Sequence, residues 1–177
     1  MTCLNNNMYF KMRRKNKEIT DHNLIEEILI KSEICRLGIN TDDVPYIVPV
    51  NYGYKDNVIY IHSAPKGRKI ELLKKNNQVS FEIEYAHKVI REGESCDWTT
   101  EFISIMGVGT IEIVSDFENK IKGLDILMKQ HGKEKNSYSE NLVKSVVILK
   151  LTIKELAGKQ SGDWKILKEI LINLKIK

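Results

Sequence analysis

The stretch VIYIHSAPKGRK, residues 58–69, joins a predicted strand to a predicted helix and decides how the rest of the chain is interpreted. Its first four residues are β-branched or aromatic, which favours a strand, and apolar residues recur at helical spacing after Lys69. Pro65 suits the first helical position, because the backbone N–H that proline lacks would have no hydrogen-bond partner within the helix there. The groups that favour an anion at this helix N-terminus are Ser63, Lys66, Gly67, Arg68 and Lys69. The stretch therefore predicts a phosphate socket, against the alternative of an ordinary strand-to-helix connection with solvated lysines.

The composition is that of one globular domain. The 177 residues are 42% hydrophobic and 29% charged, and a net charge of +4 is too small to indicate nucleic-acid binding by itself. Three cysteines without metal-ligand spacing fit a reducing cytosol, and the scattered histidines do not have the spacing of a zinc site. No signal-peptide pattern and no apolar run of about 18 residues occur, so we expect a soluble, cytoplasmic protein without a membrane segment.

The sequence divides into three predicted segments. Residues 1–11 are Asn-rich and patternless, and we expect a disordered arm there. Residues 12–160 form the expected folded domain. Residues 161–177 are predicted to be an amphipathic helix that packs on the barrel or on a partner. Its apolar positions are Ile166, Leu167, Ile170, Leu171 and Leu174.

Turn residues and apolar periodicity indicate the elements of the middle segment. Strands are predicted at 34–39, 46–54, 58–62, 79–85, 102–114 and 146–156, with a charged loop over 86–98. Helices are predicted from Asp21 to Ser32 with Thr20 or Asp21 as cap, from Pro65 to the residues before Asn76, from the capping box Ser115–Glu118 to Gln130, and after a second box at Ser137–Glu140. Six strands with early hairpins and without a βαβ rhythm predict a β-dominated α+β fold, an antiparallel Greek-key barrel with peripheral helices.

Two strand interiors carry residues that interrupt a regular ladder. Pro49 lacks a backbone N–H, which places it at a sheet edge, at a bulge or where the backbone faces a ligand. Gly107 and Gly109 lie in the middle of the longest strand, where they indicate a bulge, a barrel corner or a place where a flat ring lies on the backbone. Both interruptions are therefore candidate ligand contacts.

A series of motifs resembles the nitroimidazole-resistance (Nim-type) branch of the pyridoxamine 5′-phosphate oxidase-like flavoproteins, in order and with family-like gaps. The motifs are MRRK at 12–15, CRLG at 35–38, PYIVPVNYGY at 45–54, YIHSA at 60–64 with GRK at 67–69, VSFE at 79–82, SIMGVG at 104–109 and GK at 158–159. The resemblance implies a split β-barrel homodimer that holds FMN at each of two interface clefts and acts on a small aromatic molecule. It implies neither a nucleic-acid nor a membrane partner.

The resemblance also implies which residues hold the flavin. Its phosphate and ribityl chain would contact His62, Ser63 and Lys69, with Arg68 as a helper. The backbone of Val48, Pro49 and Val50 would lie along the isoalloxazine edge, and Trp98 and Ser104 would approach the ring, from this chain or from its partner. The C-terminal arginine motif with which pyridoxamine phosphate oxidases hold their substrate has no counterpart that we can place in this chain.

Several functions remain open at this point. The favoured one is an FMN-dependent oxidoreductase that reduces small aromatic or nitro compounds, with the electrons carried by the flavin. His62 would then be either a proton donor near the ring or a hydrogen-bond donor to the phosphate. A non-catalytic flavin- or haem-binding protein is the alternative, and nucleic-acid binding through Lys11–Lys17 and the lysines near residue 70 has the least support. Trp98 is equally a packing anchor, and Cys35 is expected to be a core residue.

Overall fold

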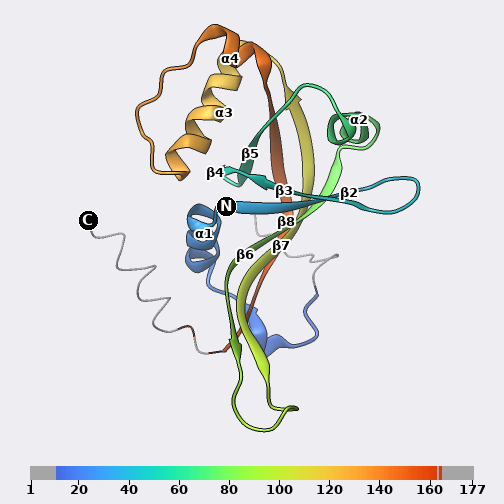
Figure 1. The fold of residues 1–177 in the computed structure, drawn as a ribbon, viewed down its shortest axis with the longest axis vertical. Helices are drawn as coiled ribbons and strands as arrows, with labels where there is room; N and C mark the ends of the chain where they lie inside the picture. The colour runs from blue at the N-terminus through green and yellow to red at the C-terminus, as the bar shows by residue number, and fades with distance from the viewer. Residues whose placement is uncertain (1–10, 163, 165–177) are drawn as a thin grey trace.

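The computed structural model describes residues 11–162 and Trp164, drawn as a ribbon in Figure 1. Most of the expected disordered arm, residues 1–10, lies outside the described residues, and so does the predicted C-terminal helix from residue 165 onward. The strands are β1 (Glu18–Ile19), β2 (Ile34–Ile39), β3 (Tyr46–Asn51), β4 (Gly53–Lys55), β5 (Val58–Ser63), β6 (Gln78–Ile90), β7 (Thr99–Val114) and β8 (Val147–Ser161). The helices are the 3₁₀ turn η1 (Lys15–Lys17), α1 (His22–Lys31), α2 (Arg68–Lys75), α3 (Phe117–Gln130) and α4 (Glu140–Ser145).

One antiparallel sheet organises the described residues. Its strand order is β3-β2-β6-β7-β8-β5-β4, and β1 pairs with β8. The β-dominated antiparallel fold with few helices is as predicted. The sheet has eight strands where the sequence predicts six, because β1 was not expected and the strand predicted over 46–54 is broken at Tyr52.

The break at Tyr52 makes the sheet curl. Before it, β3 pairs with β2, and after it, β4 pairs with β5, so two consecutive strands lie at opposite ends of the strand order. Tyr52 is fully buried, and its hydroxyl donates a hydrogen bond to the carbonyl oxygen of Leu29 in α1 at 2.7 Å. A Cβ on Gly53 would lie 2.5 Å from the Cα of Leu127 in α3. Two helices therefore hold the break from two sides.

The main core lies inside the curled sheet and under α1. It is formed by aliphatic side chains of every long strand together with the predicted apolar stripe of α1, Leu24, Ile25, Ile28 and Leu29. Asp21 caps α1 by accepting from the backbone N–H of Asn23 at 2.9 Å. In Figure 1, α1 lies beside the sheet, and α3 with α4 packs at its upper end.

Three local predictions need correction. α2 begins at Arg68 and not at Pro65, because the cap residue Gly67 has a φ of 110°, outside the helical region. The capping residues of α3 and α4 are Asp116 and Ser139, one and two residues later than the predicted boxes, because these side chains accept from the backbone N–H of Asn119 at 3.0 Å and of Leu142 at 3.4 Å.

The β6–β7 hairpin is longer than predicted. The charged loop expected over 86–98 shortens to 91–98, since β6 continues to Ile90 after a register shift between Glu84 and Ala86. Of the alternatives for Gly107 and Gly109, the bulge is observed at Gly109, as a register shift between Val108 and Gly109 against β8. A Cβ on Gly107 would lie 2.2 Å from the Phe81 ring, so this glycine lets the ring pack against bare backbone.

Candidate functional site

The predicted phosphate socket lies where β5 leads into α2. Ser63 is the last residue of β5 and is buried, and its hydroxyl donates to the carbonyl oxygen of Ala64 at 3.1 Å. His62 is exposed on the opposite face of β5, since neighbouring side chains of a strand alternate. No side chain caps the N-terminus of α2, where Gly67 is the cap residue. The socket thus combines a buried hydroxyl with an open helix N-terminus.

Two cations lie at the start of α2 and differ in their surroundings. The guanidinium carbon of Arg68 lies 5.2 Å from the ring centroid of Tyr46, which joins α2 to the first residue of β3. Lys69 is half-buried, and burial lowers the pKa of its ammonium from the usual value. A bound anion beside Lys69 would offset that cost, because an opposite charge favours the protonated form.

The strand predicted to face the flavin ring lies at an end of the sheet. Among the described residues β3 pairs only with β2, in a register that sets Val48 opposite Leu37 and Pro49 opposite Arg36. Pro49 is exposed, whereas Val48 and Val50 are half-buried against the core. Of the alternatives for Pro49, the sheet edge is the one observed. The Arg68–Tyr46 contact brings this edge and the socket together.

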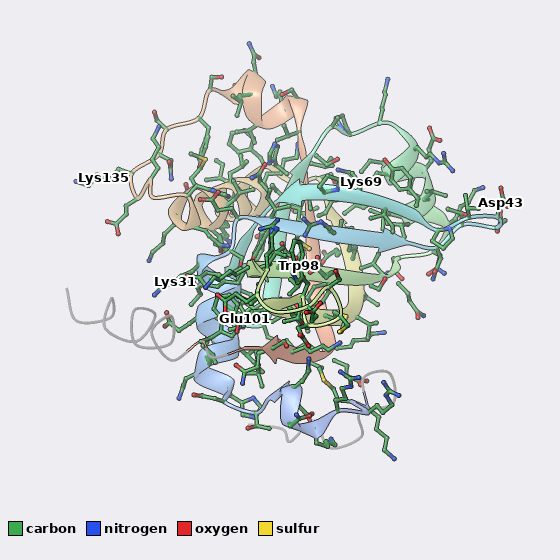
Figure 2. All side chains as sticks on the ribbon, turned by 60° about the horizontal axis from the view of Figure 1, so that its bottom comes forward. Lys31, Asp43, Lys69, Trp98, Glu101 and Lys135 are labelled. Atoms are coloured by element: carbon green, nitrogen blue, oxygen red, sulfur yellow. The ribbon has the colours of Figure 1, made fainter. Side chains whose placement is uncertain are left out.

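Trp98 and Ser104 lie apart from the socket. Trp98 is 52% exposed and ends the loop of the β6–β7 hairpin, which hangs at the bottom of Figure 1 while α2 lies near the top. Figure 2 shows its side chain together with that of Lys69. Ser104 is half-buried on β7, opposite Glu84 of β6 and Lys159 of β8. Within one chain, His62, Ser63, Arg68 and Lys69 therefore lie at the β5–α2 connection, which the Arg68–Tyr46 contact joins to β3, whereas Trp98 and Ser104 lie elsewhere.

A basic cavity of about 470 Å³ flanks Ser104, and the sequence interpretation missed it. Phe102 and Met106 line it from the same face of β7 as Ser104. The ammonium groups of Lys17 and Lys159 lie 6.0 and 5.5 Å from the centroid of the Phe102 ring. Its other lining residues are Lys11, Met12, Arg13 and Arg14. The sequence signal for this cavity was the run of basic residues at 11–17. Only the pairing of β1 with β8 shows that this run lies beside Lys159.

The described cysteines differ in exposure. Cys35 is fully buried on β2, and burial raises the pKa of its thiol to about 12. It is therefore a core residue, as expected, and not a nucleophile. Cys96 is exposed in the hairpin loop. Within the described part of the chain, no three His, Cys, Asp or Glu side chains gather as metal ligands, and no helix is long and apolar enough to cross a bilayer.

The family model for pyridoxamine 5′-phosphate oxidase matches residues 21–160. A structure of a "putative 5-nitroimidazole antibiotic resistance protein" from Bacteroides thetaiotaomicron VPI-5482 is 35% identical, with a TM-score of 0.72 over 81% of this chain and 86% of that one. The chain belongs to the pyridoxamine 5′-phosphate oxidase-like family, in its nitroimidazole-resistance branch. The resemblance drawn from the sequence motifs is confirmed.

A solved structure with lower sequence identity shares the family's fold, and a curated protein matches a shorter part of the sequence. The FAD and heme binding protein from Mycobacterium smegmatis is 18% identical, with a TM-score of 0.74 over 84% of this chain and 75% of that one. The uncharacterized protein RA0666 of Rhizobium meliloti (strain 1021) is 38% identical over 56 residues, which are 32% of this chain and 36% of that protein. At 18% identity the likeness shows the fold of this oxidase-like family and not its ligand.

Proposed function

We propose that this chain is an FMN-binding oxidoreductase that reduces small aromatic or nitro compounds, built as a homodimer of six-stranded Greek-key split barrels. The observation that carries the proposal is the socket itself. It consists of an uncapped helix N-terminus with the half-buried Lys69 in its first turn, the buried hydroxyl of Ser63 at the end of β5, and the edge of β3, which has no second partner strand among the described residues. The strand count is supported by the sheet, which has six strands when β3 and β4 are taken as one bent strand and the two-residue β1 is left out.

The residues present fit FMN. A phosphate monoester needs donors and positive charge, which the N-terminus of α2, Lys69 and Arg68 supply. Gly67 leaves open space, since a Cβ there would meet no atom within 4 Å. The edge of β3 at Val48–Val50 offers backbone groups on one side of a flat ring. When bound, FMN would supply the electron transfer on which the proposed reduction depends.

A second copy of the chain would complete the cleft. Trp98 and Ser104 lie apart from the socket of their own chain, which supports contacts from a partner protomer. The basic cavity next to Ser104 would give that wall a positive charge. His62 is exposed beside the socket, where its imidazole is placed either to bind the phosphate or to donate a proton to a bound acceptor.

A non-catalytic protein that binds flavin or haem is the second candidate. Its support is the likeness of fold to the FAD and heme binding protein from Mycobacterium smegmatis and to the flavocytochrome Anf3 from Azotobacter vinelandii, at a TM-score of 0.74 in both cases. It shares the flavin socket with the first candidate and differs in having no electron acceptor.

The absorption spectrum of the purified protein tests the socket. We expect oxidised-flavin bands and release of FMN, identified by chromatography after denaturation. In the double variant Ser63→Ala/Lys69→Ala the affinity for FMN should fall at least about tenfold, because hydrogen bonds to charged groups contribute about 1.5–3 kcal/mol each. Lys74→Ala, in the last turn of α2, is the matched control. A colourless protein that takes up no FMN in titration contradicts both candidates.

Two further measurements separate the remaining parts of the proposal. Light scattering should give a mass of about twice 20.5 kDa, and a mass near 20.5 kDa would remove the partner wall. The flavin-loaded protein should consume NAD(P)H faster when a nitroimidazole is added. A flavin-loaded dimer that reduces no nitro compound with any donor supports the binding protein in place of the oxidoreductase.

A further inference from the structure

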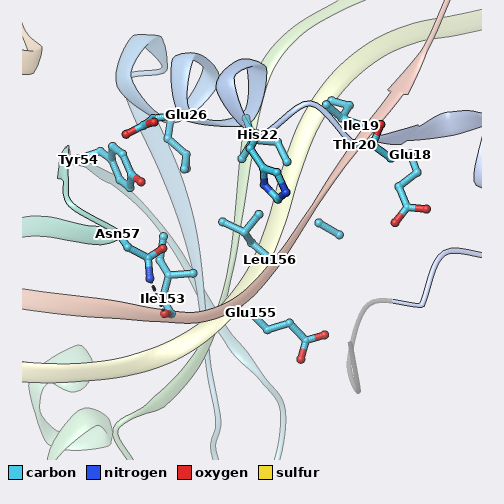
Figure 3. Close-up of a pocket in the computed structure, with 13 residues that line it drawn as sticks. Glu18, Ile19, Thr20, His22, Glu26, Tyr54, Asn57, Ile153, Glu155 and Leu156 are labelled. Atoms are coloured by element: carbon cyan, nitrogen blue, oxygen red, sulfur yellow. Dashed lines mark hydrogen bonds between the residues drawn. The ribbon is translucent and has the colours of Figure 1, made fainter. Parts of the chain in front are cut away.

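An acidic cavity lies between α1, β4 and β8, away from the socket (Figure 3). Its volume is about 630 Å³, within the range of ligand-sized cavities. Ile25, Leu29 and Leu156 give it apolar walls, and three carboxylates line it. These are Glu18, Glu26 and Glu155, and Figure 3 shows them spread around the opening. Lys and Arg are absent from its lining, so it suits an apolar occupant that carries positive charge.

The chain turns back just after β8, the strand that forms one wall of this cavity. Gly162 has a φ of 93°, in the left-handed region that favours glycine and reverses the chain. The indole N–H of Trp164 then donates to the carbonyl oxygen of Ser161 at 2.6 Å, and the Trp164 side chain packs against the main core. Trp164, the last described residue, therefore lies against the body of the protein.

The length of the remaining chain matches the distance to the cavity. Thirteen residues, 165–177, follow Trp164. As a helix they would span about 20 Å at roughly 1.5 Å per residue. The part of β8 between Ser161 and Glu155 spans a similar length, about 20 Å at roughly 3.3 Å per residue. A helix that runs back along β8 therefore reaches the acidic cavity.

The chemistry of the remaining chain complements the cavity. Residues 165–177 contain four lysines and one glutamate, and their apolar residues recur at helical spacing. We propose that residues 165–177 dock as an amphipathic helix over the acidic cavity of their own chain, with the apolar stripe on Ile25, Leu29 and Leu156 and lysines beside the carboxylates. Glu18 forms an ion pair with Lys15 at 2.9 Å, so its charge contributes less to the attraction than an unpaired carboxylate would.

Disulfide trapping in the full-length chain tests the docking. With Cys3 and Cys96 replaced by Ser, Glu26→Cys is combined in turn with Lys165→Cys, Lys168→Cys, Lys175→Cys and Lys177→Cys. We expect at least one pair to oxidise under mild conditions. Glu118→Cys, an exposed glutamate in the first turn of α3, is the matched control and should trap none of the four. Equal trapping at both sites, or none at Glu26, overturns the proposal.

Isotope mixing identifies whose cavity is filled. Copies grown in light and heavy nitrogen are mixed before oxidation, and the cross-linked peptides are analysed by mass. Peptides that join two light or two heavy segments support docking within one chain. Mixed peptides alone mean that the segment covers a partner's cavity, which overturns the intramolecular form.

Hydrogen exchange provides a test without cysteines. Leu156→Lys places a positive charge in the cavity, which would repel the lysines of residues 165–177. The backbone amides of these residues should then exchange faster. Leu72→Lys, at a half-buried leucine of α2, is the control and should leave that exchange unchanged. Two results count against the docking: amides of residues 165–177 that are not protected in the unmodified protein, or amides that stay protected in a folded Leu156→Lys variant. Either result favours a separate ligand for the cavity, such as an organic cation.

Discussion

The socket around α2 and the break at Tyr52–Gly53 are both places where the chain leaves a strand, and they are built in opposite ways. At the socket, Gly67 has open space around it and Arg68 is exposed. At the break, Tyr52 is fully buried, and the backbone of α3 leaves no room for a Cβ on Gly53. Packing is tight where the sheet changes partner and loose where an anion would bind. Substitutions at the break should therefore affect stability, and those at the socket should affect FMN binding.

The largest effect is expected from Gly53→Val. Its side chain would overlap the backbone of α3 at Leu127, and overpacking of this kind costs about 3 kcal/mol. Urea unfolding measures the loss, with Thr100→Val, an exposed position of β7, as the control. An unchanged free energy of unfolding would show that the break is not held as tightly as the contacts indicate.

Gly67→Ala should separate stability from binding. Gly67 has φ 110° and ψ 171°, a conformation almost restricted to glycine, so alanine costs about 1–3 kcal/mol of backbone strain if the turn keeps its shape. We expect a loss of FMN affinity as the N-terminus of α2 shifts. Gly132→Ala is the control, at a glycine that also has a positive φ, 85°, and no atom within 4 Å of the added Cβ, and it should leave FMN binding intact. Equal losses of FMN affinity in both variants would remove the special role of Gly67.

Tyr52→Phe should cost about 1 kcal/mol, the usual net contribution of a hydrogen bond. The loss is limited because the carbonyl oxygen of Leu29 also accepts from the side-chain amide of Gln130 at 3.2 Å. Thermal unfolding checks the value, and Tyr60→Phe on β5 is the control. If Tyr52→Phe changed the affinity for FMN and left stability unchanged, the assignment of stability to the break and of FMN binding to the socket would be wrong.

The smallest effect is expected from Lys69→Met. Burial lowers the pKa of Lys69 in the folded state, so the unfolded chain binds that proton more tightly. Stability therefore rises as the pH increases from the folded pKa toward the ordinary value of 10.5, and below that window the buried charge is a cost. Lys69→Met should slightly stabilise the protein at pH 7 and reduce the increase in stability with pH, as measured by urea midpoints at pH 7 and 10. It should also weaken FMN binding in a titration. Lys74→Met should do none of these.

The elements that were predicted well are those whose signals are local. The apolar stripe of α1 with its Asp21 cap, the early hairpin and the glycines of β7 are each readable within about 15 residues. The start of α2 was placed too early because Pro65 suits the first position of a helix. The non-helical conformation of Gly67 makes that residue the cap, so the helix begins only at Arg68. The extension of β6 beyond Tyr85 was missed because its last residues are exposed on both faces and carry no alternation.

The residues of the candidate site also differ in whether local sequence could predict them. His62, Ser63, Arg68 and Lys69 could be predicted together because they lie within eight consecutive residues of the chain. The basic cavity was missed because it joins residues 11–17 to Lys159, and nothing in either segment indicates the other. In the proposed dimer, the placement of Trp98 and Ser104 relative to a flavin would depend on a second chain, which a sequence motif does not position.

The sequence by itself determined the family and the antiparallel β class, and it is the source of the predicted phosphate socket, because these depend on local periodicity and on residue types that follow one another closely. Only the tertiary structure decided that the strand over 46–54 breaks at Tyr52, that β1 joins β8 between a basic and an acidic cavity, and that the chain turns back after Ser161. These features depend on which distant segments share a surface. Pairing of strands far apart in the chain is set by the packing of the whole core and not by the residues of one strand.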